Sequence, residues 1–246
     1  MKDNFSRQAN AYAQFRPDYP DAMIAFIMSH VVDRQTALDV ATGNGQVARK
    51  LSPFFDRVFA TDISEEQIAN ATHLPNIIYK VEAAEDTNFD DNQFDLITVA
   101  QSIHWFDFDN FYREVDRILK PDGVFAVLGY GLLSTNPASD EILRDFYSRI
   151  VGRYWDAERR YVDEMYRTIP FPLDEIPAPK FTNEFTWTFE QLCGYLETWS
   201  ATQHYIKANG TNPVDIIREA LKSTWENGNK QVVFPLLLRI GKLKHN

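Results

Sequence analysis

The sequence predicts an α/β fold in which a mostly parallel sheet is covered by helices on both faces. Short β-rich runs alternate with helical or turn-like segments over the first half of the chain. Such alternation is typical of parallel strands joined by crossovers. A glycine-bearing turn follows the first run, and the pattern changes after residue 130. The glycine-bearing turn indicates a ligand-binding turn, and the change of pattern after residue 130 indicates a helical segment late in the chain.

Length and composition predict one large globular domain. The chain has 246 residues, of which 44% are apolar and 24% are charged, as in ordinary globular proteins. A formal charge of -10 disfavours binding to nucleic acid or to anionic membranes. The single cysteine, Cys193, forms no metal-ligand cluster, so no metal is expected. No run approaches about 18 apolar residues, and we therefore expect a cytoplasmic protein. Nothing demands more than a monomer.

The first half of the chain contains the expected parallel strands. A helix over 21–32, with Pro20 before its first turn, leads into them. The clearest crossover helix spans 107–119, where apolar residues fall on one stripe and KPDG ends the helix. We interpret that stripe as core. The expected strands are 36–41, 56–63, 76–83, 94–101 and 124–131.

The second half is expected to add a cap and two more strands. Residues 139–165 predict a helix rich in aromatics and arginines, and 169–181 form a proline-rich loop. A strand-like run over 183–189 and helices over 190–199 and 213–225 follow. The last run, 231–243, suits a buried strand with an irregular point or an edge at Pro235. Residues 132–180 therefore read as a helical cap inserted between sheet strands.

A glycine-bearing turn joins the first strand to the next segment. Residues 38–51 read LDVATGNGQVARKL and contain G-x-G-x-x-A at Gly43, Gly45 and Ala48. Glycines let the backbone approach a ligand closely, and a helix that begins there presents unpaired N–H groups. Asp62 ends the next strand, where an acid accepts hydrogen bonds from a ribose diol. These features fit both a dinucleotide and an adenosyl cofactor.

Asp39 favours the adenosyl cofactor. It lies inside the first strand, before the glycines. A carboxylate there would repel a pyrophosphate but suits the ammonium of an amino-acid-like ligand, directly or through water. The loop also has no lysine for phosphates, which argues against a P-loop nucleotide triphosphatase.

Five segments occur in the order ALDVATGNGQVA, ATDIS, AAEDTNF, FDLITVAQSIHWFD and LKPDGVFAV. Together they resemble the class I S-adenosylmethionine-dependent methyltransferases, most closely the small-molecule branch with the trans-aconitate and type 11 methyltransferases. The resemblance implies a Rossmann-like, doubly wound sheet of seven strands with an antiparallel last strand. It implies a single methyltransferase domain over 1–246, with S-adenosyl-L-methionine as cofactor and S-adenosyl-L-homocysteine as product.

The resemblance also assigns cofactor residues by position. Asp39, Gly43 and Gly45 would surround the methionine portion, and Asp62 would bind the ribose hydroxyls. Either Glu85 or Asp86 would read the adenine edge. The remaining positions expected to flank the cofactor are Ile63, Ala84 and Gln101.

The N-terminal segment, residues 1–20, is expected to act as a lid. Tyr12, Arg16 and Tyr19 interleave aromatic rings with a guanidinium that could pair with the cofactor's carboxylate. In the resembling proteins this segment often folds over the cofactor. The alternative is a surface helix that packs on the sheet.

His104 and Trp105 are the candidate catalytic residues. They follow the 94–101 strand, and ligands of open α/β sheets bind beyond the carboxyl ends of strands. Their rings could form a wall around a sulfonium, and His104 could also act as a general base. The alternative is a structural role for both. Because no dedicated acid/base pair is evident, a small-molecule carboxylate is favoured as acceptor, since it is already ionised.

The cap arginines have two interpretations. Arginines would suit a polycarboxylate, but nearby acids at 156, 158, 163 and 164 favour surface ion pairs. The residues concerned are Arg149, Arg153, Arg159, Arg160 and Arg167.

Two other functions remain open from the sequence. G-x-G-x-x-A with Asp62 also fits a nicotinamide-dependent oxidoreductase. A non-catalytic protein that binds S-adenosylmethionine is the third hypothesis.

Overall fold

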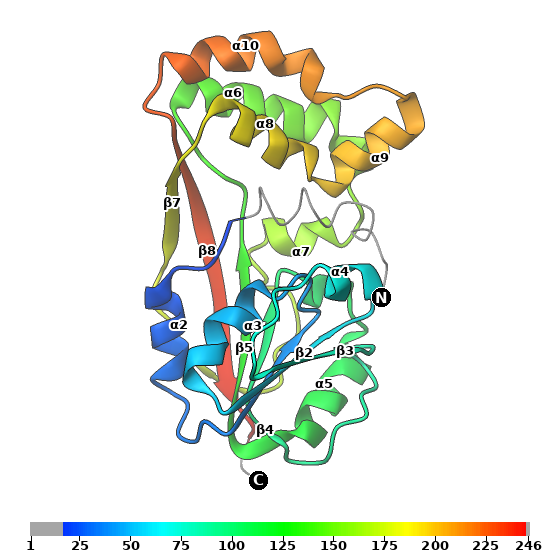
Figure 1. Cartoon of the computed structure of the whole chain (residues 1–246). Helices are drawn as coiled ribbons and strands as arrows, with labels where there is room; N and C mark the ends of the chain where they lie inside the picture. The colour runs from blue at the N-terminus through cyan, green and yellow to red at the C-terminus, as the bar shows by residue number, and fades with distance from the viewer. Residues whose placement is uncertain (1–16, 245–246) are drawn as a thin grey trace.

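The computed structural model describes residues 17–244 of the chain (Figure 1). A mixed sheet runs through its lower half, with strands in the order β3-β2-β1-β4-β5-β8-β6. The first five strands are parallel, whereas β8 is antiparallel to β5 and β6. This arrangement confirms the predicted fold class. The strands are β1 (Thr36–Val40), β2 (Arg57–Asp62), β3 (Ile77–Val81), β4 (Phe94–Ala100), β5 (Leu119–Tyr130), β6 (Asp174–Ile176), β7 (Thr182–Thr186) and β8 (Gln231–Lys242).

Both faces of the sheet are buried. Along β5, Val124 and Ala126 face one apolar cluster, while Phe125 and Val127 face the other. The first cluster includes side chains of α2 (Asp21–Met28) and α3 (Gln46–Leu51), and the second includes those of α5 (Phe108–Ile118). The alternation follows from the period of two in a strand. The sheet is therefore the middle layer between helices.

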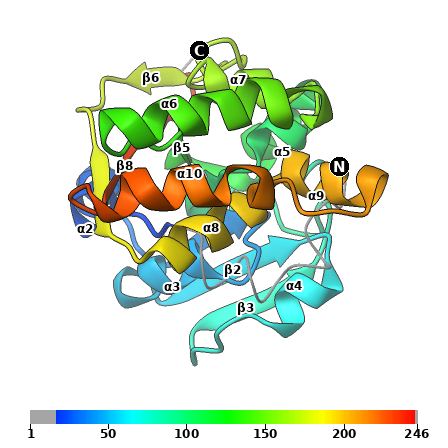
Figure 2. The ribbon, with the colours of Figure 1, turned by 90° about the horizontal axis from the view of Figure 1, so that it is seen from above.

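Most helices above the sheet form an upper layer (Figures 1 and 2). There α10 packs against both α6 and α8. One cluster of buried apolar side chains runs from the sheet into this layer and contains both Val58 and Trp225. The remaining helices are α4 (Glu65–Ala69), α6 (Pro137–Asp145), α7 (Arg159–Asp163), α8 (Phe189–Glu197), α9 (Ser200–Asn209) and α10 (Val214–Glu226).

The upper layer draws on more of the chain than the expected 132–180 cap. Besides α6 it includes α8, α9 and α10, and α7 lies between these helices and the sheet. Two strands connect it to the sheet: the short β7 pairs with the part of the longer β8 that extends above β5. Pro235 lies where β8 changes partner, and its carbonyl accepts the Gly131 N–H at 2.9 Å. We call the upper helices together with α7 and the segments that join them, residues 132–169 and 187–230, the cap layer.

The continuous helix expected over 139–165 is a wrong prediction. After α6 the chain forms a π-helical turn, Phe146–Ile150, and a 3-10 turn, Gly152–Tyr154, and Trp155 is extended. The Tyr147 and Trp155 rings contact each other at a centroid distance of 4.9 Å. Burying both rings against each other requires the chain to fold back, so tertiary packing overrides local helix periodicity.

Two elements were missed by the sequence analysis. The three-residue β6 lies inside the proline-rich loop and pairs with the end of β8. The α9 helix lies between the two predicted helices and ends at Gly210 in the left-handed conformation. Such a glycine is a helix-end signal, so the sequence contained evidence for α9.

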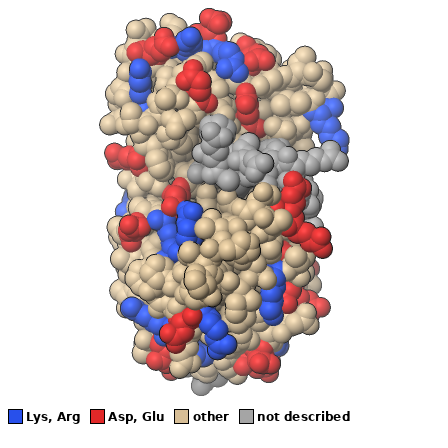
Figure 3. Space-filling view, viewed as in Figure 1, with Lys and Arg blue, Asp and Glu red and all other residues tan. Residues whose placement is uncertain are grey.

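Charged side chains are spread over the surface, and the described helices are short. Basic and acidic side chains are interspersed over the face seen in Figure 3. Within residues 17–244, no helix has the length and apolar content needed to cross a membrane.

Candidate functional site

A pocket opens where the strand order reverses between β1 and β4. Both strands end in a residue with positive φ, Ala41 at 51° and Gln101 at 55°. At these turns the segments that follow β1 and β4 diverge, as they do at the ligand-binding crevice of open α/β sheets. The pocket is lined by residues 41–44 and the start of α3, by Ala100 and Gln101 after β4, and by Pro17, Tyr19 and Tyr130.

Asp39 lies behind this pocket and holds its loop. The side chain is fully buried. One carboxylate oxygen accepts hydrogen bonds from Thr42 Oγ1 at 2.5 Å and from the Ala48 N–H at 3.1 Å, and the other accepts from Thr98 Oγ1 at 2.8 Å. Burial raises the pKa of Asp39 to about 6. Its hydrogen bonds join β1, the loop and α3 within the protein.

Asp62 holds the other side of the same loop. Its carboxylate accepts the Gly43 N–H and the Ser64 N–H, each at 2.9 Å. Gly43 has a φ of 57° and Gly45 a φ of 83°, a region that glycine occupies without steric cost. A Cβ on Gly45 would overlap the Tyr79 ring on β3. Two buried acids therefore fix the path of the loop from both sides.

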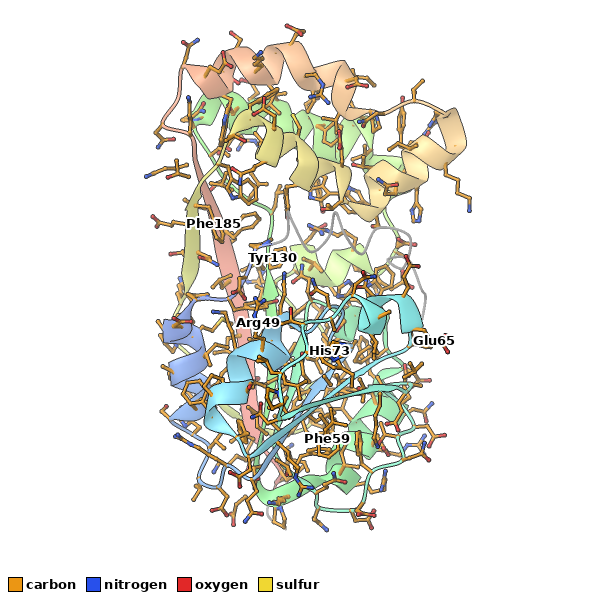
Figure 4. All side chains as sticks on the ribbon, viewed as in Figure 1. Arg49, Phe59, Glu65, His73, Tyr130 and Phe185 are labelled. Atoms are coloured by element: carbon orange, nitrogen blue, oxygen red, sulfur yellow. The ribbon has the colours of Figure 1, made fainter. Side chains whose placement is uncertain are left out.

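Gln101 closes the pocket floor toward β5. Its Oε1 accepts the Tyr130 N–H at 2.8 Å, and its Nε2 donates to the Tyr130 carbonyl at 3.2 Å. Figure 4 shows Tyr130 at the upper end of β5, below the cap layer. The Gln101 side chain thus binds the neighbouring strand, and its backbone lines the pocket. Tyr130 was not among the expected site residues, although it lies near the end of the strand expected over 124–131.

The residues expected near an adenine lie along β2 and after β3. Ile63 is 40% exposed directly after the polar Asp62. An apolar side chain left open beside a carboxylate is the surface that a flat, nucleoside-like group would cover. Ala84 is buried, and Glu85 Oε1 accepts the Asp107 N–H at the start of α5, at 3.2 Å. These residues fit an adenosyl group, whose ribose would meet Asp62 and whose base would meet Ile63.

His104 is a buried neutral residue between the sheet and the cap layer. It belongs to a 3-10 turn, Ile103–Trp105, and its Nδ1 lies 3.0 Å from the Tyr166 hydroxyl. Burial, assisted by the charge of Arg159, lowers the pKa of His104 to about 3. The Trp105 ring lies 4.8 Å from the imidazole. The imidazole is therefore uncharged at neutral pH and is oriented by a cap tyrosine.

Two expected lid residues, Tyr12 and Arg16, lie outside the described residues. Tyr19, from the same expected lid segment, lines the pocket, and its ring lies 6.4 Å from that of Tyr130. Within residues 17–244, no group of three or more His, Cys, Asp and Glu side chains could hold a metal ion.

The structure brings together part of the expected site. Of the expected cofactor residues that it describes, Gly43 and Gln101 line the pocket. Asp39 and Asp62 support the loop from behind. His104 and Trp105 lie beyond β4, where Tyr166 joins them from the cap layer.

Comparisons with known proteins indicate a methyltransferase. A family model described as a methyltransferase domain matches residues 38–127. A protein of Dictyostelium discoideum named as a methyltransferase is 30% identical over 249 residues, which cover 98% of this chain and 95% of that protein. A solved structure described as a type II methyltransferase from Anaeromyxobacter dehalogenans is 37% identical with a TM-score of 0.85, covering 94% of this chain and 100% of that one.

A more distant structure shares the fold alone. It is phosphoethanolamine N-methyltransferase 2 of Haemonchus contortus, solved with phosphomonomethylethanolamine and S-adenosylhomocysteine. It is 18% identical with a TM-score of 0.50, and the match covers 98% of this chain and 58% of that one.

Proposed function

The chain belongs to the class I S-adenosylmethionine-dependent methyltransferases, and we propose that its acceptor is a small molecule methylated on a carboxylate. The cofactor is S-adenosylmethionine, which supplies a methyl group on a positively charged sulfur. The family membership disfavours the nicotinamide-dependent oxidoreductase and the non-catalytic protein as alternatives.

The buried neutral His104 carries this proposal. An imidazole whose pKa is lowered to about 3 is a weak base. It is therefore a poor general base for removing a proton from an acceptor at neutral pH. An amine or phenol acceptor would need a proton removed before or during transfer. A carboxylate is already ionised at neutral pH. The site therefore suits an acceptor that reacts without a base.

The residues of the chain then act by position rather than by proton transfer. Methyl transfer is an in-line displacement, so aligning acceptor, methyl and sulfur and excluding water is the main task. Asp39 and Asp62 fix the loop on the cofactor side. The His104 ring, which Tyr166 contacts, and the Trp105 ring beside it would form the wall toward the acceptor.

Turnover measurements test the proposal. We expect S-adenosylhomocysteine to form with aliphatic carboxylates, and the rate to stay level between roughly pH 7 and 8.5, because neither a carboxylate acceptor nor the buried His104 titrates there and the Asp39 pKa of about 6 lies below that range. His104→Ala should lower kcat about 10- to 100-fold through misalignment, with a smaller loss of cofactor affinity. His30→Ala, a histidine that follows α2 and packs on Phe26, is the control. Turnover confined to amines, with a rate that rises with pH, would contradict the proposal.

A further inference from the structure

Arg159 differs from the other cap arginines in its burial. Its side chain is 18% exposed, whereas that of Arg149 is 81% exposed. Arg153, Arg160 and Arg167 are also exposed. Arg159 begins α7, which lies between the sheet and the upper helices in Figure 1. A mostly buried guanidinium is costly unless its donors are used.

The Arg159 guanidinium is held by hydrogen bonds from its Nε edge and by aromatic rings packed on its planar face. Its Nε donates to Tyr147 Oη at 2.9 Å and to Asp163 Oδ1 at 3.3 Å. The Trp155 ring lies 4.6 Å and the Tyr147 ring 5.4 Å from its central carbon. These contacts fix the orientation of the planar group and reduce the entropy lost when it binds a ligand.

The opposite edge of the guanidinium offers free donors. Within residues 17–244, neither Nη1 nor Nη2 of Arg159 has a hydrogen-bond partner. Two Nη donors side by side match the two oxygens of a carboxylate, and such bidentate pairs are among the strong hydrogen bonds. The neighbouring Arg160, by contrast, is exposed and donates from Nη2 to Tyr161 Oη at 3.0 Å.

Arg159 also lies close to the candidate catalytic residues. The α7 helix packs against the turn that contains His104, and Tyr166, three residues after α7, contacts His104. The charge of Arg159 contributes to the lowered pKa of His104. A series of ring contacts runs from Trp155 through Trp199, Tyr195 and Phe234 to Tyr130 at the pocket.

We propose that the Nη edge of Arg159 binds an anionic group of the acceptor other than the carboxylate that is methylated. The inference rests on the proposed function. A carboxylate held by a guanidinium loses nucleophilicity, so the reacting oxygen and the bound anion belong to different groups. Arg159 then selects acceptors that carry two anionic groups at a fixed separation.

Binding to the full chain saturated with S-adenosylhomocysteine tests this inference without turnover. The probes are the dicarboxylates malonate through adipate, the matching monocarboxylates, and 4-phosphonobutyrate. We expect at least one dicarboxylate to bind more tightly than its monocarboxylate. Arg159→Gln should weaken that binding roughly 10- to 100-fold, and Arg159→Lys should restore it in part, because lysine keeps the charge but not the planar fork.

Controls separate this role from a structural one. Arg160→Gln removes an exposed arginine that also lies over a tyrosine ring, and it should leave every affinity unchanged. Unchanged affinity for S-adenosylhomocysteine in the Arg159 variants shows that the cofactor edge is intact. Tighter binding of 4-phosphonobutyrate than of glutarate identifies a phosphate-type anion as the group that Arg159 binds.

The inference would be overturned if the wild type bound dicarboxylates and monocarboxylates equally, or bound neither. It would also be overturned if Arg159→Gln kept the full affinity for dicarboxylates. The proposed function fails separately, if no carboxylate is methylated while Arg159-dependent anion binding persists.

Discussion

The cofactor edge of the sheet and the cap layer meet at one site but are built by different interactions. At the cofactor edge, meaning the loop 41–45 and the ends of β2 and β4, buried carboxylates and backbone N–H groups fix the chain. In the cap layer, aromatic rings packed on one another position the charged groups. Hydrogen bonds tolerate little displacement, whereas ring packing accepts several geometries. The loop is therefore held in one geometry, whereas the cap layer can accommodate changes in ring packing.

The largest expected effect comes from filling the space at Gly45. Gly45→Ala would place a Cβ 2.2 Å from the Tyr79 hydroxyl oxygen and 3.1 Å from its ring carbon Cζ, at a φ of 83°. Overpacking and a strained φ together should cost roughly 2 to 5 kcal/mol of unfolding free energy. We also expect the affinity for S-adenosylmethionine to fall, because the loop must shift. Urea unfolding and calorimetric titration measure the two effects.

Gly210 provides the matched control in the cap layer. It has a φ of 71°, but a Cβ there would meet no atom within 4 Å. Gly210→Ala should therefore cost only about 1 kcal/mol from backbone strain and leave cofactor affinity unchanged. Equal losses in the two variants would show that the cofactor edge is no more tightly packed than the end of a cap helix.

The glycine loop after β1 could be predicted from the sequence because its signals are local. A strand, a glycine turn and an acid at the next strand end lie close together in the chain, and β1 and β2 pair in parallel with Asp39 opposite Ala60. The acids were found at Asp39 and Asp62, yet their bonds to the loop were not foreseen. Which backbone N–H groups an acid reaches depends on the turn geometry at Gly43.

The cap layer could be predicted only as helical and aromatic. Five arginines there looked alike, and only the structure separates Arg159 by its burial and its contacts with Trp155. Tyr166 reaches His104 across 62 positions of sequence. Such contacts come from long-range packing, which leaves no periodic pattern in a single sequence.

The buried Asp39 should make the stability of the loop side depend on pH. Because its folded pKa is raised to about 6, the folded state holds this proton more tightly than the unfolded chain does. The stabilising contribution is therefore fully present below about pH 4 and is lost as the pH rises through about 6. Relative to Asp39→Asn, the wild type should lose about 3 kcal/mol of unfolding free energy over that interval.

Denaturant unfolding of both proteins between acidic and neutral pH measures this difference. The amide does not titrate, so the difference between the two curves isolates Asp39 from the other acids. Curves that run parallel would mean that Asp39 is as well solvated in the folded state as in the unfolded chain.

The smallest expected effect separates the two regions most directly. Asp62→Ala removes the acceptor of the Gly43 and Ser64 N–H groups and the expected ribose ligand. Each such loss costs about 1 to 3 kcal/mol, so affinity for S-adenosylhomocysteine should fall roughly 10- to 100-fold. Acceptor KM at saturating cofactor should change little, since the cap layer is intact, and Asp33→Ala, an exposed acid, should change neither. A variant that keeps its cofactor affinity but loses acceptor affinity would reverse the assignment, placing the acceptor rather than the cofactor at the end of β2.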